Sequence, residues 1–191
     1  MRHAQPLVGA GVCYGATDMP ADAAATAACA AQAATVLPQA AQLWCSPRQR
    51  CTQLAEVLRT VRPDLHLAQV AGLAEMDFGC WEGVRWDAIP KAAIDAWTAQ
   101  FWDARFGGRD SVRELMERVA AVWARAQAAP GPVVWITHAG VIRAASLLSA
   151  GTTVIARADQ WPVDAPGFGG WVRLALHPGA RATGVSPAAM R

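Results

Sequence analysis

The chain has 191 residues, of which 53% are hydrophobic and 17% are charged, a composition that supports a sizeable core and argues against general disorder. Its net charge of +2 gives no sign of the concentrated basic surface that nucleic-acid-binding proteins carry, and no apolar run is long enough to span a bilayer. The sequence has no signal-peptide features, so we expect a cytoplasmic protein, and its length suits one domain, residues 1–191. Its five cysteines lack the spacing of a zinc site, so we expect free thiols and no metal. We expect neither nucleic acid nor a membrane as a partner.

The start of the chain predicts a loop followed by a helix. Residues 7–19 are rich in glycine and small side chains, which favours a loop. Pro20 suits the first position of a helix, with Asp18 nearby as its cap. The alanine-rich run 21–36 is expected to be that helix, because alanine has the highest intrinsic helix propensity.

A short strand and a second helix are expected next. Residues 42–45 form an apolar run that is typical of a strand. Ser46-Pro47 then supplies an N-cap hydroxyl and a proline at the first position of a helix that extends to about Val61. Arg48 and Arg50 therefore fall in the first helical turn, where the positive end of the helix dipole also favours an anion.

The middle of the chain is predicted to hold one strand, a loop and a helix. Residues 65–70 favour a strand, and residues 73–86 favour a loop. Residues 87–104 are expected to be helical, although Pro90 interrupts the start. Gly107-Gly108 then breaks the chain.

A long amphipathic helix and a buried strand follow. Ser111 and Glu114 have the spacing of a capping box. After them, apolar residues recur at three- and four-residue intervals: Val112, Leu115, Met116, Val119, Val122, Trp123 and Ala126. Residues 133–136 read as a continuous apolar strand of a parallel sheet, and His138-Ala139-Gly140 leads directly into an apolar helix that ends near Ala150.

The alternation of strands and helices predicts the fold class. The last strands are expected at 152–156 and 171–176, and the tail 178–191 is expected to be frayed. This order is typical of a three-layer α/β/α fold with a mostly parallel central sheet. Ligands of such sheets bind at the carboxyl ends of the strands. The segments Ser46–Arg50 and Thr137-His138 each follow a strand, so we expect them to meet at one rim.

Five side chains have the chemistry that phosphoryl transfer needs. The transferred phosphoryl group spreads negative charge over its oxygens, and arginine binds two such oxygens at once, which favours Arg2 and Arg50. His3 is the candidate nucleophile, through one ring nitrogen while the other holds the proton. His138 would donate to the phosphoryl oxygens, and Glu75 would protonate the leaving oxygen and then deprotonate water.

Each of these residues also has an ordinary structural interpretation when it is taken alone. They can be read as a solvated terminal histidine, a satisfied core histidine, surface arginines and an exposed loop carboxylate. Three further carboxylates compete with Glu75 for the acid role: Asp77, Glu82 and Asp87. His66 and His177 have no chemically interesting neighbours in the sequence and are interpreted as structural.

Four motifs occur in an order that is more specific than any one of them. They are Arg2-His3-Ala4, Ser46-Pro47-Arg48-Gln49-Arg50-Cys51-Thr52-Gln53-Leu54-Ala55, Leu73-Ala74-Glu75-Met76-Asp77-Phe78-Gly79-Cys80-Trp81-Glu82-Gly83 and Thr137-His138-Ala139-Gly140. Over residues 2–150 this order resembles the histidine phosphatase superfamily, also called phosphoglycerate mutase-like.

The resemblance implies a phosphoglycerate mutase-like fold and a phosphohistidine on His3, with no cofactor. The residues matching its site are Arg2, His3, Arg50, Glu75, His138 and Ala139. Cys13-Tyr14-Gly15 is most similar to the α-ribazole phosphatase branch of cobalamin biosynthesis, which implies α-ribazole 5′-phosphate as the small phosphorylated substrate. The alternatives are a broad-specificity phosphatase, a phosphoglycerate mutase-type enzyme and, from another class, a catalytically silent phosphate-ligand-binding protein. A homodimer is left open.

The sequence departs from the family pattern in two ways. Ala4 and Ala139 stand where the family has glycine, which is tolerable if the backbone φ there is negative. A central apolar strand precedes Arg-His in the family, whereas only Met1 precedes Arg2 here. The start of this sequence is therefore expected to lie too late. Without that strand, neighbouring strands are expected to carry unpaired backbone groups, and His3 is expected to be loosely held.

Overall fold

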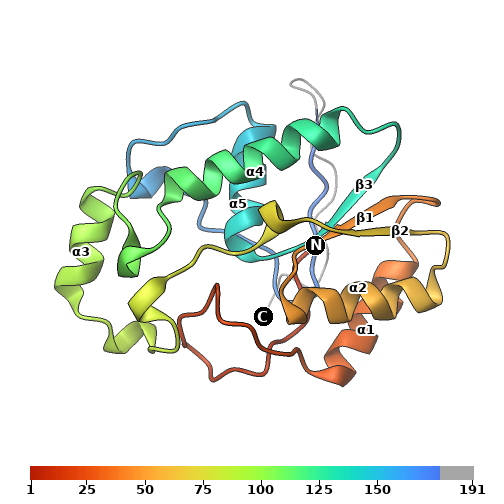
Figure 1. Ribbon diagram of the computed structural model, residues 1–191, viewed down its shortest axis with the longest axis horizontal. Helices are drawn as coiled ribbons and strands as arrows, with labels where there is room; N and C mark the ends of the chain where they lie inside the picture. Colours follow the sequence, from red (N-terminus) through yellow and green to blue (C-terminus); the bar gives the residue numbers. More distant parts are fainter. Residues whose placement is uncertain (177–191) are drawn as a thin grey trace.

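The computed structural model describes residues 1–176 and contains a parallel sheet with helices on both faces (Figure 1). The sheet has three strands in the order β2-β1-β3: β1 Gln42–Cys45, β2 His66–Gln69 and β3 Val133–Ile136. The α-helices of the described residues are α1 Ala23–Ala34, α2 Gln49–Val61, α3 Lys91–Ala99, α4 Val112–Gln127 and α5 Ala139–Ser149. From α1 to α5 the strands and helices follow one another in the order that the sequence predicts.

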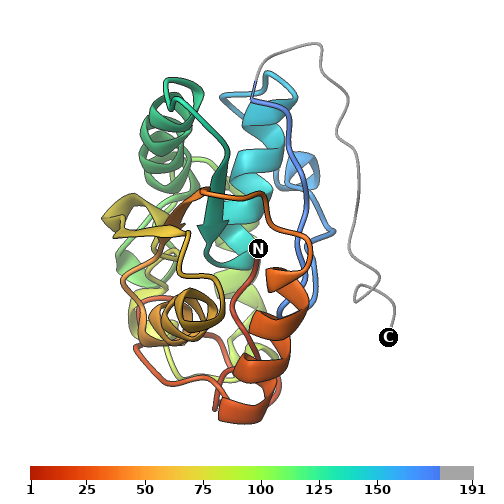
Figure 2. The ribbon, with the colours of Figure 1, turned by 90° about the vertical axis from the view of Figure 1, so that its right-hand side faces the viewer.

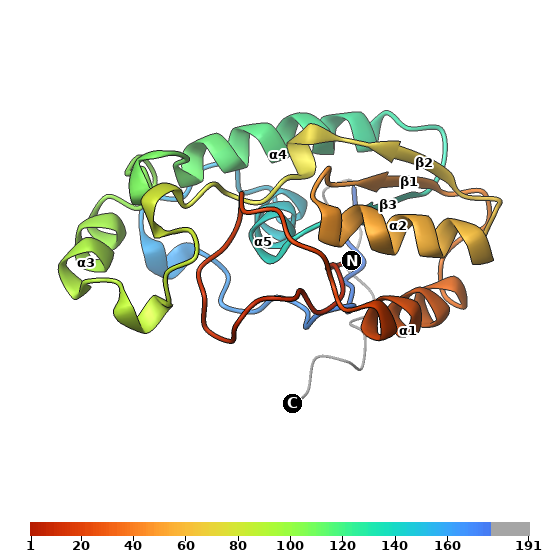
Figure 3. The same cartoon turned by 60° about the horizontal axis from the view of Figure 1, so that its bottom comes forward.

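Helices α1 and α2 lie on one face of the sheet and α4 and α5 on the other (Figure 3), and a separate hydrophobic core lies on each face. Successive side chains of a strand point to opposite faces. Leu43 and Cys45 of β1 therefore pack with α1 and α2, whereas Trp44 between them packs with α4 and α5. This arrangement confirms the three-layer α/β/α prediction, and Ser111 and Glu114 form the predicted capping box of α4.

The first helix begins later than the sequence indicated. Asp22 caps α1 by accepting a hydrogen bond from the N–H of Ala25 at 2.7 Å. The prediction that Pro20 opens this helix with Asp18 as its cap is therefore wrong. Asp18 instead accepts a hydrogen bond of 2.7 Å from the first N–H of α2, so its carboxylate stabilises the start of the other helix on this face.

The second helix also begins late, after Arg48 rather than after Ser46. The N–H of Ser46 donates to the carbonyl of Ile136 at 2.9 Å, so the chain still follows the sheet at this residue. The prediction that Ser46-Pro47 starts the helix is wrong by two residues. As a result the Ser46 hydroxyl lies beside His138, where it takes part in the site described below.

The two strands expected near the C-terminus do not form. Residues 152–156 and 171–176 contain no strand, and Val172 alone forms an isolated bridge. Residues 171–176 face β3 across a cavity instead of pairing with it. His177 and the tail 178–191 lie outside the described residues. Within the part of the chain that the structure covers, no helix has the length and hydrophobicity to cross a membrane.

The first three residues pair with the end of β3. Arg2 forms a parallel bridge with Thr137, the N–H of His3 donates to the carbonyl of Thr137 at 3.0 Å, and Thr137 donates back to Met1 at 3.0 Å. On the other side Arg2 donates to the carbonyl of Gly170 at 2.9 Å. Figure 2 shows the N-terminus between β3 and the blue segment that contains Gly170. The expectation that His3 is loosely held is wrong.

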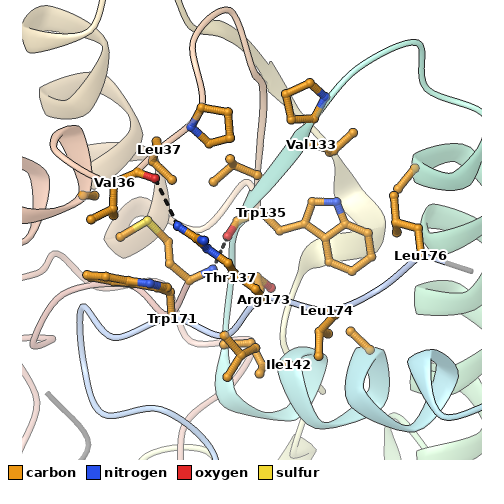
Figure 4. Close-up of a pocket in the computed structure, with 18 of the residues that line it drawn as sticks. Val36, Leu37, Val133, Trp135, Thr137, Ile142, Trp171, Arg173, Leu174 and Leu176 are labelled. Carbon is orange, nitrogen blue, oxygen red and sulfur yellow. Dashed lines mark hydrogen bonds between the residues drawn. The ribbon is translucent and has the colours of Figure 1, made fainter. Parts of the chain in front are cut away.

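Beyond Met1, the open edge of β3 faces an apolar cavity of about 360 Å³ (Figure 4). Its walls come from the end of α1, from α4 and α5, and from residues 171–176: Ala33, Val36, Leu37, Trp123, Ala126, Ile142, Ala145, Trp171 and Leu174 among others. Parallel ladders alternate sides, so the N–H and C=O groups of Val133 and Trp135 point into this cavity.

The amino group of Met1 projects into the same cavity. It donates to the carbonyl of Trp135 at 2.5 Å. Burial lowers the pKa of this amino group from 8.0 to about 5, with the Cys51 thiol acting weakly in the opposite direction. Except at that carbonyl, the edge of β3 carries no backbone partner among the described residues, as the sequence led us to expect.

Candidate active site

His3 lies at the carboxyl end of the sheet in a fixed orientation. It is 1% exposed, and its Nδ1 lies 2.7 Å from the carbonyl of Ala4. A carbonyl only accepts, so Nδ1 carries the proton and Nε2 keeps its lone pair. Burial lowers the pKa of His3 to about 3, and the charges of Arg50 and Arg2 add to this effect. The ring is therefore neutral at physiological pH, as a nucleophile must be.

His138 faces His3 from the start of α5. The two ring centroids are 5.3 Å apart. Nε2 of His138 lies 2.8 Å from the Ser46 hydroxyl, which already accepts the N–H of Arg48 at 3.3 Å. When the hydroxyl donates its hydrogen to Nε2, the ring proton of His138 lies on Nδ1. That Nδ1 is buried without a partner in the described structure, and in this tautomer it is an unused donor. Burial and the nearby charge of Arg50 hold the pKa of His138 well below its usual value.

Arg50 is completely buried and joins the helix α2 to the loop after Cys13. Its Nη1 donates to the carbonyl of Thr17 at 2.9 Å, and its Nη2 donates to Gly15 at 2.7 Å. Its Cζ lies 5.2 Å from the centre of the Tyr14 ring. Nε is buried and has no partner among residues 1–176. Burial lowers the pKa of this guanidinium group but leaves it charged.

Glu82 organises this loop and is not a rival for the acid role. Its carboxylate accepts hydrogen bonds from the backbone N–H groups of Gly15, Ala16, Thr17 and Phe78, at 2.9 to 3.0 Å. Burial alone would raise the pKa of Glu82, but the hydrogen bonds outweigh it and lower the pKa. The carboxylate therefore holds in place the two carbonyl groups that bind Arg50.

The other two competing carboxylates are also occupied elsewhere. Asp77 accepts the N–H of Gly79 at 2.8 Å, within its own turn. Asp87 is exposed and pairs with Arg85 at 2.6 Å. His66 is an exposed residue of β2, as its structural interpretation predicted.

Glu75 approaches the site through the start of α5. Its Oε2 accepts the N–H of Gly140 at 2.9 Å, and its Oε1 accepts the N–H of Met76 at 3.1 Å. A Cβ on Gly140 would lie 2.3 Å from Oε1, so only glycine allows the carboxylate to come this close. Ala139 lies between His138 and Gly140 as the first residue of α5.

The two alanines in glycine positions are compatible with the backbone. Among the non-glycine residues that the structure describes, Ala40 alone has a positive φ, at 51°. Ala4 and Ala139 therefore need no left-handed conformation, which matches the condition under which the sequence tolerates them. The methyl group of Ala4 is fully buried.

Arg2 is placed beside His3 by an aromatic residue that the motifs did not reveal. Its Cζ lies 3.9 Å from the centre of the Phe168 ring, and the His3 ring lies 5.4 Å from the same ring. Nη1 of Arg2 donates to the carbonyl of Pro166 at 3.2 Å. Nothing in the glycine- and proline-rich sequence around Phe168 indicated this contact, because it depends on pairing between distant segments.

The predicted site residues thus meet in one place. Arg2, His3, Arg50, Glu75, His138 and Ala139 come from both ends of the sequence and lie around a common point at the carboxyl ends of β1 and β3. Sequence reasoning missed the contacts that Ser46, Glu82 and Phe168 make. Ser46 and Glu82 belong to the motifs quoted above, whereas Phe168 carried no signal.

A family model described as histidine phosphatase superfamily (branch 1) matches residues 1–166 of this α/β chain. The chain belongs to this superfamily, and therefore to the phosphatase class of enzymes. No curated protein matches the sequence.

Solved structures share the fold across most of the chain. A Thermus thermophilus protein, TTHB049, is 25% identical, with 90% of this chain and 89% of that chain covered and a TM-score of 0.68. A mycobacterial glucosyl-3-phosphoglycerate phosphatase is 21% identical, with coverage of 90% and 86% and a TM-score of 0.73. A protein described as mycobacterial hydrolase 2 is 22% identical, with coverage of 90% and 78% and a TM-score of 0.74.

Proposed function

We propose that the chain hydrolyses phosphate monoesters through a covalent phosphohistidine on His3, without a metal or cofactor. The observation that carries this proposal is the hydrogen bond between His3 Nδ1 and the Ala4 carbonyl, at 2.7 Å. It fixes one neutral tautomer, with the lone pair on Nε2, in a ring whose centroid lies 5.3 Å from that of His138 and on which the charges of Arg50 and Arg2 act.

In the first step, Nε2 of His3 attacks phosphorus and the bond from phosphorus to the ester oxygen breaks. Glu75 in its acid form gives its proton to the leaving oxygen, so the product leaves as a neutral alcohol. Arg2 and Arg50 balance the charge on the phosphoryl oxygens, and Nδ1–H of His138 donates to one of them.

In the second step, water attacks the phosphohistidine. Glu75, now a carboxylate, takes a proton from the water as its oxygen bonds to phosphorus. The phosphorus–nitrogen bond breaks, its electron pair returns to Nε2, and phosphate leaves. His3 is again neutral and Glu75 is again protonated, so the cycle is balanced.

The test is to trap the intermediate on a single residue. The enzyme would be mixed with a generic aryl phosphate in excess chelator, quenched in base, and analysed by peptide mass spectrometry for phosphohistidine. We expect the phosphoryl group on His3, full turnover in chelator, and loss of both in His3→Ala. His66→Ala is the matched control, because His66 is exposed on β2 and should retain activity. A requirement for added metal, or phosphate on another residue, contradicts the mechanism.

The substrate is a narrower question. Cys13-Tyr14-Gly15 favours α-ribazole 5′-phosphate among nucleotide-like and sugar phosphates, and the Tyr14 ring lies close to Arg50 at the site. Broad specificity and mutase-type transfer are the alternatives among enzymes. A silent phosphate-binding protein is the alternative from another class: it would bind vanadate with no turnover of any ester. A panel of esters compared by kcat/KM separates these options.

A further inference from the structure

Four arginines, not two, keep a buried nitrogen without a partner around the site. The Nε atoms of Arg2, Arg48, Arg50 and Arg143 are buried and make no hydrogen bond within residues 1–176. A buried donor without a partner is unfavourable, so such atoms usually mark a place where a ligand or water completes the bonding. Four guanidinium charges exceed what a phosphate dianion and one carboxylate can balance.

Arg143 is the member of this group on the Glu75 side. It lies three residues after Gly140 in α5, so the two share one face of the helix. The N–H of Gly140 is the group that binds the Glu75 carboxylate, at 2.9 Å. Arg143 therefore lies one helical turn beyond the N–H group that binds the Glu75 carboxylate.

The position of Arg143 is fixed by the segment that also fixes Arg2. Nη2 of Arg143 donates to the carbonyl of Val163 at 2.9 Å, and Nη1 of Arg2 donates to Pro166 at 3.2 Å. The two carbonyls are three residues apart, so they lie within about 10 Å of each other. Nη1 of Arg143 has no hydrogen-bond partner among the described residues, and with Nε it offers two free donors.

Burial makes the charge of Arg143 unfavourable unless an anion lies beside it. It lowers the pKa of Arg143, while Glu75 acts in the opposite direction. Asp164 is the other carboxylate close enough to act on Arg143, but it is exposed and makes no ion pair with it within 4.0 Å. An anion that reached Arg143 would therefore replace little existing pairing.

We propose that Arg143 binds a second anionic group, such as a carboxylate, on the leaving group of the substrate. This inference rests on the proposed function, because the leaving oxygen must lie at Glu75 for the remainder of the alcohol to reach α5. It makes Arg143 a specificity-determining residue. It also ranks α-ribazole 5′-phosphate, whose alcohol carries no anion, below phosphate esters of hydroxy acids.

The test uses two substrates that differ in one group. In 3-phosphoglycerate a carboxylate stands where glycerol 3-phosphate has a neutral CH₂OH. We expect the wild-type kcat/KM to be higher for 3-phosphoglycerate, and Arg143→Ala to lower it by about 10- to 100-fold, mainly through KM, as expected for a charge-assisted contact. Turnover of glycerol 3-phosphate should change by no more than about 3-fold, since uniform binding of the phosphate is intact.

Two further variants separate recognition from support of the fold. Arg143→Lys keeps the charge and should recover part of the preference for 3-phosphoglycerate. Arg59→Ala removes a guanidinium group of α2 whose side chain is 55% exposed, and should leave both substrates unaffected. If Arg143 serves only to hold Val163, Arg143→Ala lowers kcat/KM for both esters equally, which overturns the proposal.

The outcome also distinguishes this inference from the proposed function. If the wild-type enzyme hydrolyses both esters with equal kcat/KM, the phosphatase stands and the second anion site is rejected. If it hydrolyses neither of these esters nor an aryl phosphate, the proposed function itself has failed. A wild-type preference that Arg143→Ala leaves unchanged also rejects the assignment to Arg143.

Discussion

The open edge of β3 predicts that the chain gains stability from an extension on the amino side of Met1. Four β-branched residues, for example Val-Ile-Val-Ile, would lie opposite residues 132–135 if they continued the register in which Arg2 pairs with Thr137. Both faces of such a strand would contact apolar side chains, from α1 on one face and from α4 and α5 on the other. Strands buried on both faces are typically continuous apolar runs.

The first contribution comes from the charge of Met1. Its amino group titrates at 8.0 when unfolded and at about 5 when folded. Between these values the unfolded chain binds a proton that the folded chain excludes, so stability falls as pH decreases. The loss is about 1 kcal/mol at pH 7 and roughly 4 kcal/mol at pH 5. A peptide bond at this nitrogen removes the charge and therefore the whole loss.

The second contribution comes from pairing and burial. The backbone groups of Val133 and Trp135 that point into the cavity would gain partners, each worth about 1 kcal/mol. Each β-branched side chain that fills part of the cavity contributes about 1.5 to 3 kcal/mol, before the entropy of ordering the extension is subtracted. We therefore expect a net gain of several kcal/mol at pH 7.

Urea unfolding from pH 5 to pH 9 measures both contributions. The extended chain should be more stable and should lose the pH dependence between 6.5 and 8. Chemical acetylation of Met1 is the matched control for charge alone: it should flatten the same slope with a smaller gain. A Gly-Ser-Gly-Ser extension controls for length. If the apolar extension stabilises no more than the Gly-Ser one, the cavity does not accept a strand and the reasoning is refuted.

Three other predictions follow from single contacts. Gly140→Ala places a methyl group against the Glu75 carboxylate, so kcat should fall by about 100-fold while the melting temperature stays nearly unchanged. Gly131→Ala is the control, because its methyl group meets open space and should have no effect. Equal activities of the two variants would contradict the geometry. Glu82→Gln weakens the hydrogen bonds that hold the loop around Arg50, so it should lower the free energy of unfolding in urea by about 1 to 3 kcal/mol. The same variant should raise the KM for phosphate esters. An unchanged KM would mean that this loop does not contribute to substrate binding. The pKa of His3 is lowered to about 3, so stability should decrease as pH falls from 6.5 towards 3, and His3→Gln should reduce this slope; an unaltered slope would mean that the ring is not desolvated.

The sequence was sufficient for those elements whose signals are local. The capping box of Ser111 and Glu114 and the apolar stripe after it predicted α4 because caps and helical periodicity act within a few residues. The continuous apolar runs at 42–45 and 133–136 predicted buried parallel strands for the same reason. The start of α1 was missed because Asp18 and Asp22 are both good caps, and only the packing of α1 against α2 selects one.

Segments whose structure depends on distant partners could not be predicted. Residues 171–176 have strand-like composition, but they lie across the cavity from β3 and find no ladder. For the site, the order of motifs indicated which residues converge. It did not reveal that the Ser46 hydroxyl lies against Nε2 of His138, or that Arg2 lies over Phe168, since each contact joins segments more than 90 residues apart.

The arrangement of charge explains why the site is built from buried groups. Arg50 and the two histidines are almost completely buried before any ligand binds, so their charges and dipoles act in a medium that screens them little. Both imidazoles are kept neutral by that burial and by the neighbouring guanidinium groups, which leaves them able to attack or donate. In the proposed mechanism an arriving phosphate supplies the negative charge that these groups lack. We expect it to meet donors that the fold already holds in place, which is the condition under which electrostatic stabilisation of a transition state is strongest.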